Sequence, residues 1–137
     1  MNKLLYASIL LAASLSGCQH DSDSPAPALS DELAGTWRLT NLQCFCPAGQ
    51  PVPNEVLMLD TSQHFKLFRN GTLAAAGTYA TSQGANCSAN DMVPFITLTA
   101  SAANVYVPKG AYSLANNTLV IDQCSAADGP RYTYQRQ

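Results

Sequence analysis

The chain has 137 residues, a formal net charge of −2 and only 12% charged side chains. This length suits one small domain. The seven basic residues form no stripe along the sequence. Because nucleic acids are bound through clustered Lys and Arg side chains, the composition argues against a nucleic-acid partner.

The chain begins with a short apolar leader. Lys3 precedes an apolar stretch over residues 4–15, which is shorter than the roughly 20 residues of a transmembrane helix. The stretch runs into Leu-Ser-Gly-Cys at residues 15–18, which resembles the lipobox of bacterial lipoproteins. The resemblance implies that residues 1–17 are a signal peptide and that Cys18 becomes a first residue bearing acyl chains such as palmitate. The alternative is an ordinary secretory signal in which the cysteine is coincidental.

A polar, proline-bearing segment follows Cys18. Residues 19–30 cannot bury enough apolar surface to order themselves, so residues 18–30 are predicted to be a lipidated, flexible tether and residues 31–137 the folded domain. No second long apolar run occurs, so we expect the acyl chains to be the membrane anchor. Gln19 follows the cysteine, which by resemblance to the sorting rule of enterobacterial lipoproteins favours the outer membrane. Display on the periplasmic side or the cell surface stays open.

The predicted domain holds four cysteines: Cys44, Cys46, Cys87 and Cys124. An even number in a chain sent to an oxidising compartment predicts two disulfides. A ring closed across one residue is strained, so we expect Cys44 and Cys46 to pair with distant partners. In an up-and-down barrel one of them should bond Cys124, whereas Cys87 would fall at the opposite end unless its loop folds back. A four-thiolate metal site is the alternative, but the C-x2-C spacing of zinc sites is missing, and we expect no metal.

Short runs with period-two alternation, separated by turn residues, fill the domain. The expected strands cover residues 36–42, 55–60, 64–69, 72–80, 94–100, 118–123 and 131–136, with an ambiguous stretch at 104–114. Asn70-Gly71 predicts a tight hairpin turn, and residues 81–92 read as a long polar loop. The pattern predicts an all-β domain, either an antiparallel up-and-down β-barrel of about eight strands or a meander sandwich.

Gly35-Thr36-Trp37 resembles the G-x-W at the first strand of lipocalins, which belong to the calycin barrels. The later order F-x-L-x-x-N-G-T, G-T-Y and R-Y-x-Y also resembles small bacterial lipocalin-like lipoproteins. The resemblance implies that Trp37 closes the barrel floor and that Arg136 or Arg131 packs over it. A second resemblance, to META-type domains of stress-linked lipoproteins, rests on L-x-G-x-W-x-L.

No phosphate-binding glycine loop, nucleophile elbow or metalloprotease motif occurs, so we expect no enzyme and no cofactor. The interpretation that follows is a monomeric binding module for a small apolar or amphipathic molecule, with a filled, ligand-free interaction barrel as the alternative. Aromatic side chains on alternating strands are more often core than ligand contacts. The candidates for the ligand lining or the barrel floor are Trp37, Phe65, Tyr112, Tyr132, Tyr134 and Arg136.

Overall fold

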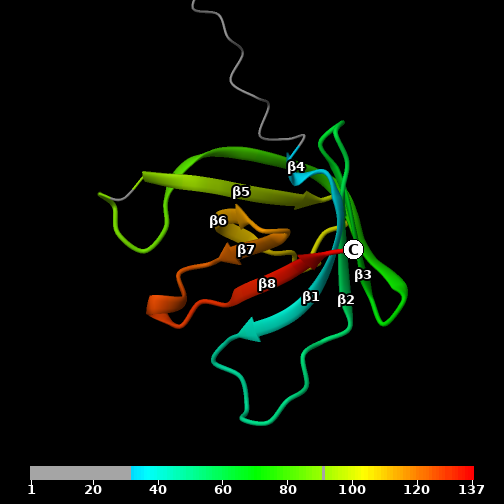
Figure 1. The fold of residues 1–137 in the computed structure, drawn as a ribbon, viewed down its shortest axis with the longest axis horizontal. Helices are drawn as coiled ribbons and strands as arrows, with labels where there is room; N and C mark the ends of the chain where they lie inside the picture. The colour runs from blue at the N-terminus through cyan, green and yellow to red at the C-terminus, as the bar shows by residue number, and fades with distance from the viewer. Residues whose placement is uncertain (1–31, 91) are drawn as a thin grey trace, which may run out of the picture.

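The computed structural model describes residues 32–90 and 92–137. The predicted signal peptide, Cys18 and the predicted tether lie outside the described residues. Eight antiparallel strands follow one another and close into a barrel in which the last strand pairs with the first (Figure 1). The strands are β1 (Gly35–Gln43), β2 (Glu55–Leu59), β3 (His64–Arg69), β4 (Thr72–Ala85), β5 (Met92–Ala100), β6 (Lys109–Ala115), β7 (Thr118–Asp122) and β8 (Arg131–Arg136). The prediction of an all-β, up-and-down barrel is confirmed.

Alternation along the strands separates the barrel interior from its surface. In β2, for example, Leu57 and Leu59 are buried while the intervening Met58 is exposed. Successive side chains of a strand point to opposite faces, so each strand contributes every second residue to the core. Seven core side chains are 0% exposed: Trp37, Leu57, Leu67, Ile96, Leu119, Ile121 and Tyr134.

One end of the barrel is closed around Trp37. The indole N–H donates a hydrogen bond to the Leu33 carbonyl at 2.9 Å, and Arg136 Cζ lies 4.1 Å from the ring centroid. The guanidinium also donates to the carbonyls of Ala34 at 2.7 Å and Glu32 at 2.5 Å. A cation over an indole face, held by backbone carbonyls, is a favourable arrangement. Of the two arginines considered for this role, the structure selects Arg136.

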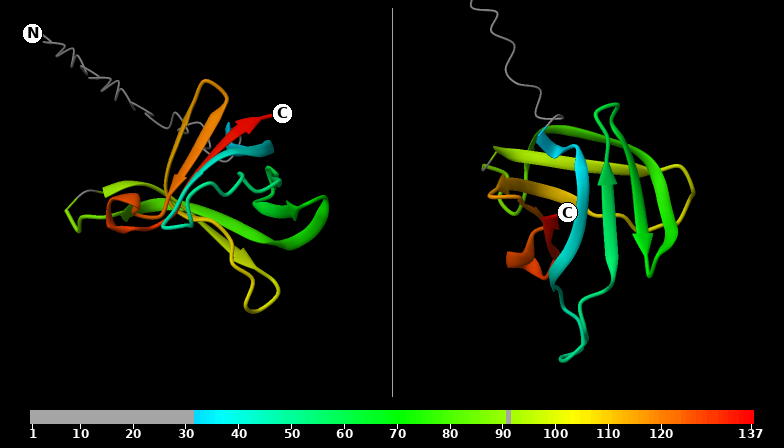
Figure 2. Two further views of the ribbon diagram at one scale, coloured as in Figure 1. Left: turned by 90° about the horizontal axis from the view of Figure 1, so that it is seen from below. Right: turned by 45° about the vertical axis from the view of Figure 1, so that its right-hand side comes forward.

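The prediction of a loop over residues 81–92 is wrong for residues 81–85 and for Met92, which belong to strands, and is confirmed for residues 86–90. β4 continues to Ala85, which pairs with Met92 at the start of β5. Cross-strand hydrogen bonds satisfy this backbone, so the exposed polar side chains of Ser82 and Gln83 do not prevent a strand. The long β4–β5 hairpin reaches to one side of the molecule, and the β6–β7 hairpin crosses it steeply (Figure 2).

The predicted disulfide pairing is also wrong. The structure joins Cys44 to Cys46 and Cys87 to Cys124. The chain bends as it leaves β1, which brings the Cα atoms of Cys44 and Cys46 to 5.1 Å, a usual separation for a disulfide. Cys87 reaches Cys124 because it sits at the tip of the elongated β4–β5 hairpin, where the Asn86 side chain accepts a hydrogen bond from the Cys124 N–H at 3.1 Å.

The two disulfides constrain very different lengths of chain. Cys87 and Cys124 are separated by 37 positions, whereas Cys44 and Cys46 are separated by 2. In the chain-entropy treatment these loops correspond to about 4 and about 1.5 kcal/mol of stabilisation, respectively. The Cys87–Cys124 bond therefore ties the β4–β5 hairpin to the β7–β8 connection, and the Cys44–Cys46 bond restrains little beyond its own turn.

Candidate ligand-binding site

A partly open pocket lies where β5 and β6 separate. The two strands pair only at Phe95–Ala111, Ile96–Gly110 and Thr97–Lys109, whereas β6 pairs with β7 along the whole of β7. Beyond Ala111, β6 therefore follows β7 away from β5, and the gap forms a pocket of about 510 Å³. We call it the lateral pocket. Its lining is Glu32, Leu33, Val93, Pro94, Ala111, Tyr112, Ser113, Leu114, Val120, Asp122 and Arg131.

Gly110 permits the close approach of β6 to the end of β7. Its φ is +145°, a conformation that residues with a side chain rarely adopt. A Cβ built on Gly110 would lie 2.2 Å from the Asp122 carbonyl oxygen of β7, which is far too close. The close packing of β6 on β7, the strand that β6 follows beyond Ala111, thus requires a glycine at this position.

Tyr112 carries the polar group of interest in the lateral pocket. Its side chain is 9% exposed, and its hydroxyl has no hydrogen-bond partner among the described residues. Burial, reinforced by the negative charge of Glu32, raises the pKa of Tyr112, so the hydroxyl stays protonated. A buried hydroxyl without a partner is unfavourable and rare in native proteins. A ligand atom able to donate or accept a hydrogen bond would relieve that deficit.

Three charged residues border the lateral pocket: Glu32, Asp122 and Arg131, of which the last two differ in how far their side chains are already paired. The Asp122 carboxylate already accepts hydrogen bonds from the Ser125 backbone N–H at 2.7 Å and from its hydroxyl at 3.0 Å. The exposed Arg131 side chain makes no hydrogen bond or ion pair to any other described residue. The pocket thus joins apolar walls to the unpartnered hydroxyl of the buried Tyr112 and to an unpaired cationic side chain, a combination that suits an amphipathic molecule.

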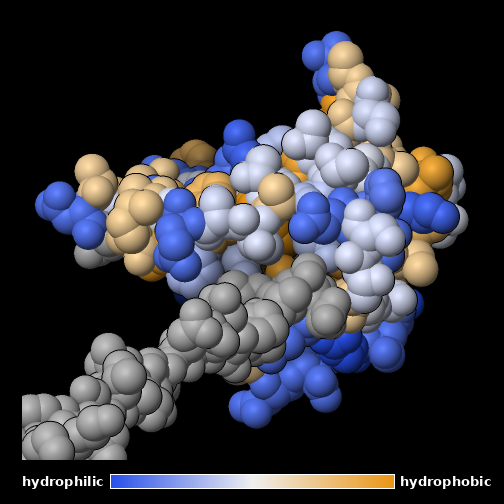
Figure 3. Space-filling view, turned by 90° about the horizontal axis from the view of Figure 1, so that it is seen from above, coloured by the Kyte–Doolittle hydropathy of each residue, from blue (hydrophilic) through white to orange (hydrophobic). Residues whose placement is uncertain are grey.

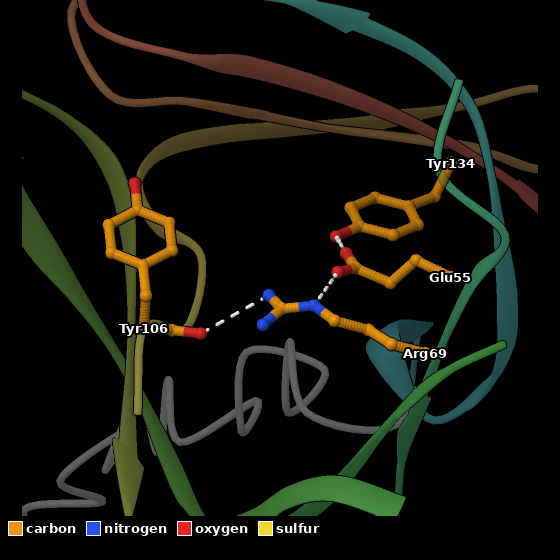
Figure 4. Close-up of polar contacts among 4 residues, drawn as sticks. All are labelled: Glu55, Arg69, Tyr106 and Tyr134. Carbon is orange, nitrogen blue, oxygen red and sulfur yellow. Dashed lines mark hydrogen bonds and ion pairs between the residues drawn. The ribbon is translucent and has the colours of Figure 1, made fainter. Parts of the chain in front are cut away.

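A second polar cluster crosses the barrel interior away from Trp37. The Glu55 side chain is 3% exposed, and its carboxylate accepts hydrogen bonds from the Tyr134 hydroxyl at 2.7 Å and from Arg69 Nε at 2.8 Å (Figure 4). Arg69 also donates to the Tyr106 carbonyl at 3.2 Å. Burial first, and then the charge of Glu55, raises the pKa of Tyr134 well above its usual value.

This cluster extends to the β5–β6 and β7–β8 connections. The Tyr106 hydroxyl donates to Gln123 Oε1 at 2.6 Å. Burial raises the pKa of Tyr132, and a side-chain hydrogen bond with Tyr106 adds to the increase. The cluster therefore links β2, β3 and β8 to two connections, and it occupies the interior with satisfied polar groups.

The predicted site residues do not form one site. Trp37 and Arg136 close one barrel end, and Tyr132 and Tyr134 are buried with the Glu55 cluster. Phe65 is a core residue that borders a separate shallow depression near the β2–β3 turn. Only Tyr112 lines the lateral pocket.

Sequence reasoning missed Glu55 and Arg69 as interior residues. The strand alternation contained a signal for these positions. Glu55 is in phase with the buried Leu57 and Leu59 of β2, and Arg69 is in phase with the buried Phe65 and Leu67 of β3. The two charges are also directly paired across β2 and β3. A strand that directs a charge inward next to an inward opposite charge predicts a buried ion pair.

Comparisons with known proteins give no relative: no protein-family model, curated protein or solved structure matches the chain. Among residues 32–90 and 92–137, no helix is long and apolar enough to cross a membrane. Within the same ranges, no group of three or more His, Cys, Asp or Glu side chains could hold a metal ion. The fold and the site define the class: a small eight-stranded β-barrel with a lateral pocket and two disulfides.

Proposed function

We propose that this protein is a lipid-anchored lipoprotein of the bacterial outer membrane that binds one small apolar or amphipathic molecule in the lateral pocket. The observation that carries the binding proposal is the lateral pocket itself, which is lined by the buried Tyr112, whose hydroxyl has no hydrogen-bond partner among the described residues. A volume of about 510 Å³ falls in the range of small-molecule sites. The anchor at Cys18 rests on the lipobox resemblance alone.

The site differs from the one expected of a lipocalin-like barrel. The interior around Trp37 is occupied by protein, since Arg136 covers the indole ring and Leu57 and Leu67 are fully buried. Space is instead found at the side, where β5 and β6 part. We therefore propose that the ligand binds in the lateral pocket rather than at the barrel floor.

The test of binding uses the full chain and the apolar fluorophore N-phenyl-1-naphthylamine. We expect saturable fluorescence at one probe per chain. Ser113→Trp places a large side chain into the pocket from an exposed position and should weaken binding about ten-fold or more. Lys109→Trp, an exposed position on the same strand outside the pocket lining, is the matched control and should bind as the wild type does. Equal binding by both variants would exclude the lateral pocket as the site.

Tyr112→Phe tests the polar contact separately from the space. Losing one hydrogen bond of about 1 kcal/mol weakens binding of a hydrogen-bonding ligand about five-fold. Native mass spectrometry of the protein purified from its host supplies such a ligand if one is retained. The anchor is tested by Cys18→Ala, which should move the protein from the membrane fraction to the soluble fraction.

The competing function is a structural or interaction lipoprotein without a ligand, as the META-type resemblance implies. It is favoured by the seven core side chains that are fully buried along the barrel. The face shown in Figure 3 is mostly hydrophilic or neutral, with apolar residues at separate places rather than in one broad patch. A host-purified protein with no retained molecule and no saturable probe binding would favour this function over ligand binding.

A further inference from the structure

The Cys44–Cys46 disulfide sits on an exposed turn directly after β1. Cys44 is half-buried and Cys46 is exposed, while Phe45 between them is 92% exposed. The bond spans only 2 positions, so it restrains the unfolded chain far less than the Cys87–Cys124 bond does. A disulfide that is accessible and adds little to the fold can be opened without unfolding the barrel.

We propose that the Cys44–Cys46 disulfide is a thiol–disulfide exchange site that oxidises pairs of cysteines in extended polypeptides. Exposed and strained disulfides are the labile and reactive ones, whereas buried structural disulfides resist reduction. A ring closed across a single residue is constrained by its size alone. Arg131 borders both this site and the lateral pocket, but no cysteine lines the lateral pocket, and the proposal does not depend on ligand binding.

The exchange proceeds in two balanced steps. A substrate thiolate attacks Cys46 Sγ, the more exposed sulfur, which forms a mixed disulfide and breaks the Cys44–Cys46 bond with Cys44 leaving as a thiolate. The second substrate thiolate then attacks the substrate sulfur of the mixed disulfide and releases Cys46. The substrate loses two electrons and two protons and gains a disulfide, while Cys44 and Cys46 become a dithiol. A further turnover needs a disulfide oxidant such as oxidised glutathione.

The surroundings of the two sulfurs suit this chemistry. Cys44 borders a surface depression together with Arg131 and Asp128. The Arg131 side chain makes no hydrogen bond or ion pair to any other described residue, so its charge is available to a leaving thiolate, with the Asp128 carboxylate opposing it. Phe45, which lies between the two cysteines in the sequence, offers an exposed apolar side chain, which fits the exposed apolar side chains of an extended polypeptide better than a folded protein.

The decisive experiment mixes the oxidised full chain with a reduced synthetic peptide that carries two cysteines flanked by Leu and Phe. We expect one peptide disulfide per chain, formed at least about ten-fold faster than with the Cys44→Ser/Cys46→Ser double variant. The Cys87→Ser/Cys124→Ser double variant is the matched control and should keep the wild-type rate. Equal rates for wild type and the Cys44/Cys46 double variant would overturn the proposal.

Mass mapping of the wild type keeps the test independent of variants that fail to fold. A peptide with a single cysteine should be recovered as a mixed disulfide on Cys46, whereas recovery on Cys87 or Cys124 would overturn the assignment. Phe45→Ser should slow oxidation of the apolar peptide about three-fold or more while oxidation of reduced dithiothreitol, which has no apolar side chain, is unchanged. Unchanged oxidation of the peptide would remove Phe45 from the proposed site.

Discussion

Replacing Glu55 by Gln probes the buried polar cluster most directly. The substitution keeps the shape of the side chain but removes the negative charge of the carboxylate. That carboxylate accepts hydrogen bonds from the Tyr134 hydroxyl at 2.7 Å and from Arg69 Nε at 2.8 Å. The amide oxygen can still accept one of these hydrogen bonds, but the amide NH₂ then faces the other donor. Tyr134 is fully buried, so its hydroxyl cannot form a replacement hydrogen bond with water. The loss of stability therefore comes mainly from the hydrogen bond between Tyr134 and residue 55.

The expected loss follows from the burial of each partner. A hydrogen bond to a charged group contributes about 1.5–3 kcal/mol, and leaving a buried donor unsatisfied costs about the same. The Arg69 side chain is 37% exposed, so solvent screening reduces its share to less than about 1 kcal/mol. We therefore expect Glu55→Gln to lower the free energy of unfolding by about 2 kcal/mol, or the midpoint temperature by about 10 °C for a domain of this size.

Urea unfolding followed by tryptophan fluorescence measures this loss, because Trp37 is the single tryptophan of the chain. Glu32→Gln, at an exposed carboxylate, is the control and should change stability by less than about 0.5 kcal/mol. A double-mutant cycle with Tyr134→Phe should give a coupling energy of at least about 1 kcal/mol. A loss below about 0.5 kcal/mol for Glu55→Gln, or additive effects of the two substitutions, would refute the reasoning.

Two further predictions concern alkaline stability and the disulfides. The folded-state pKa of Tyr134 is raised, so the folded chain keeps this proton above pH 10 while the unfolded chain releases it. The contribution of Tyr134 to the free energy of unfolding is full below about pH 10 and falls by about 1.4 kcal/mol per pH unit above it. Urea unfolding between about pH 9 and 11 should therefore show a shallower fall of the free energy of unfolding for Tyr134→Phe than for the wild type. By calorimetry, Cys87→Ser/Cys124→Ser should lose about 4 kcal/mol of stability and Cys44→Ser/Cys46→Ser about 1.5 kcal/mol, and the reverse order would contradict the loop-length argument.

Much of the barrel could be predicted because its strands are local patterns. The Asn70-Gly71 turn illustrates this: both residues adopt positive φ, 51° and 78°, as the dipeptide predicts for a tight hairpin. Alternation likewise predicted the inward face of β3, where Phe65 and Leu67 are buried. Neighbouring residues suffice for such features, since the backbone period fixes which side chains share a face.

The failures arise where distant segments decide the outcome. Residues 82–85 are polar enough to read as a loop, but pairing with β5 makes them a strand. That pairing carries Cys87 to Cys124, and no count of alternating strands could reveal it. A tight turn after β1 leaves Cys44 and Cys46 to pair with each other.

The sequence by itself therefore determined the class of fold, the positions of most strands and the interior faces of β1 and β3, because these follow from periodicity and turn residues. The tertiary structure alone decided which cysteines meet and that space opens beside Tyr112 rather than above Trp37. These features depend on the register between strands and on where β6 leaves β5, and register is a relation between segments that no single segment encodes.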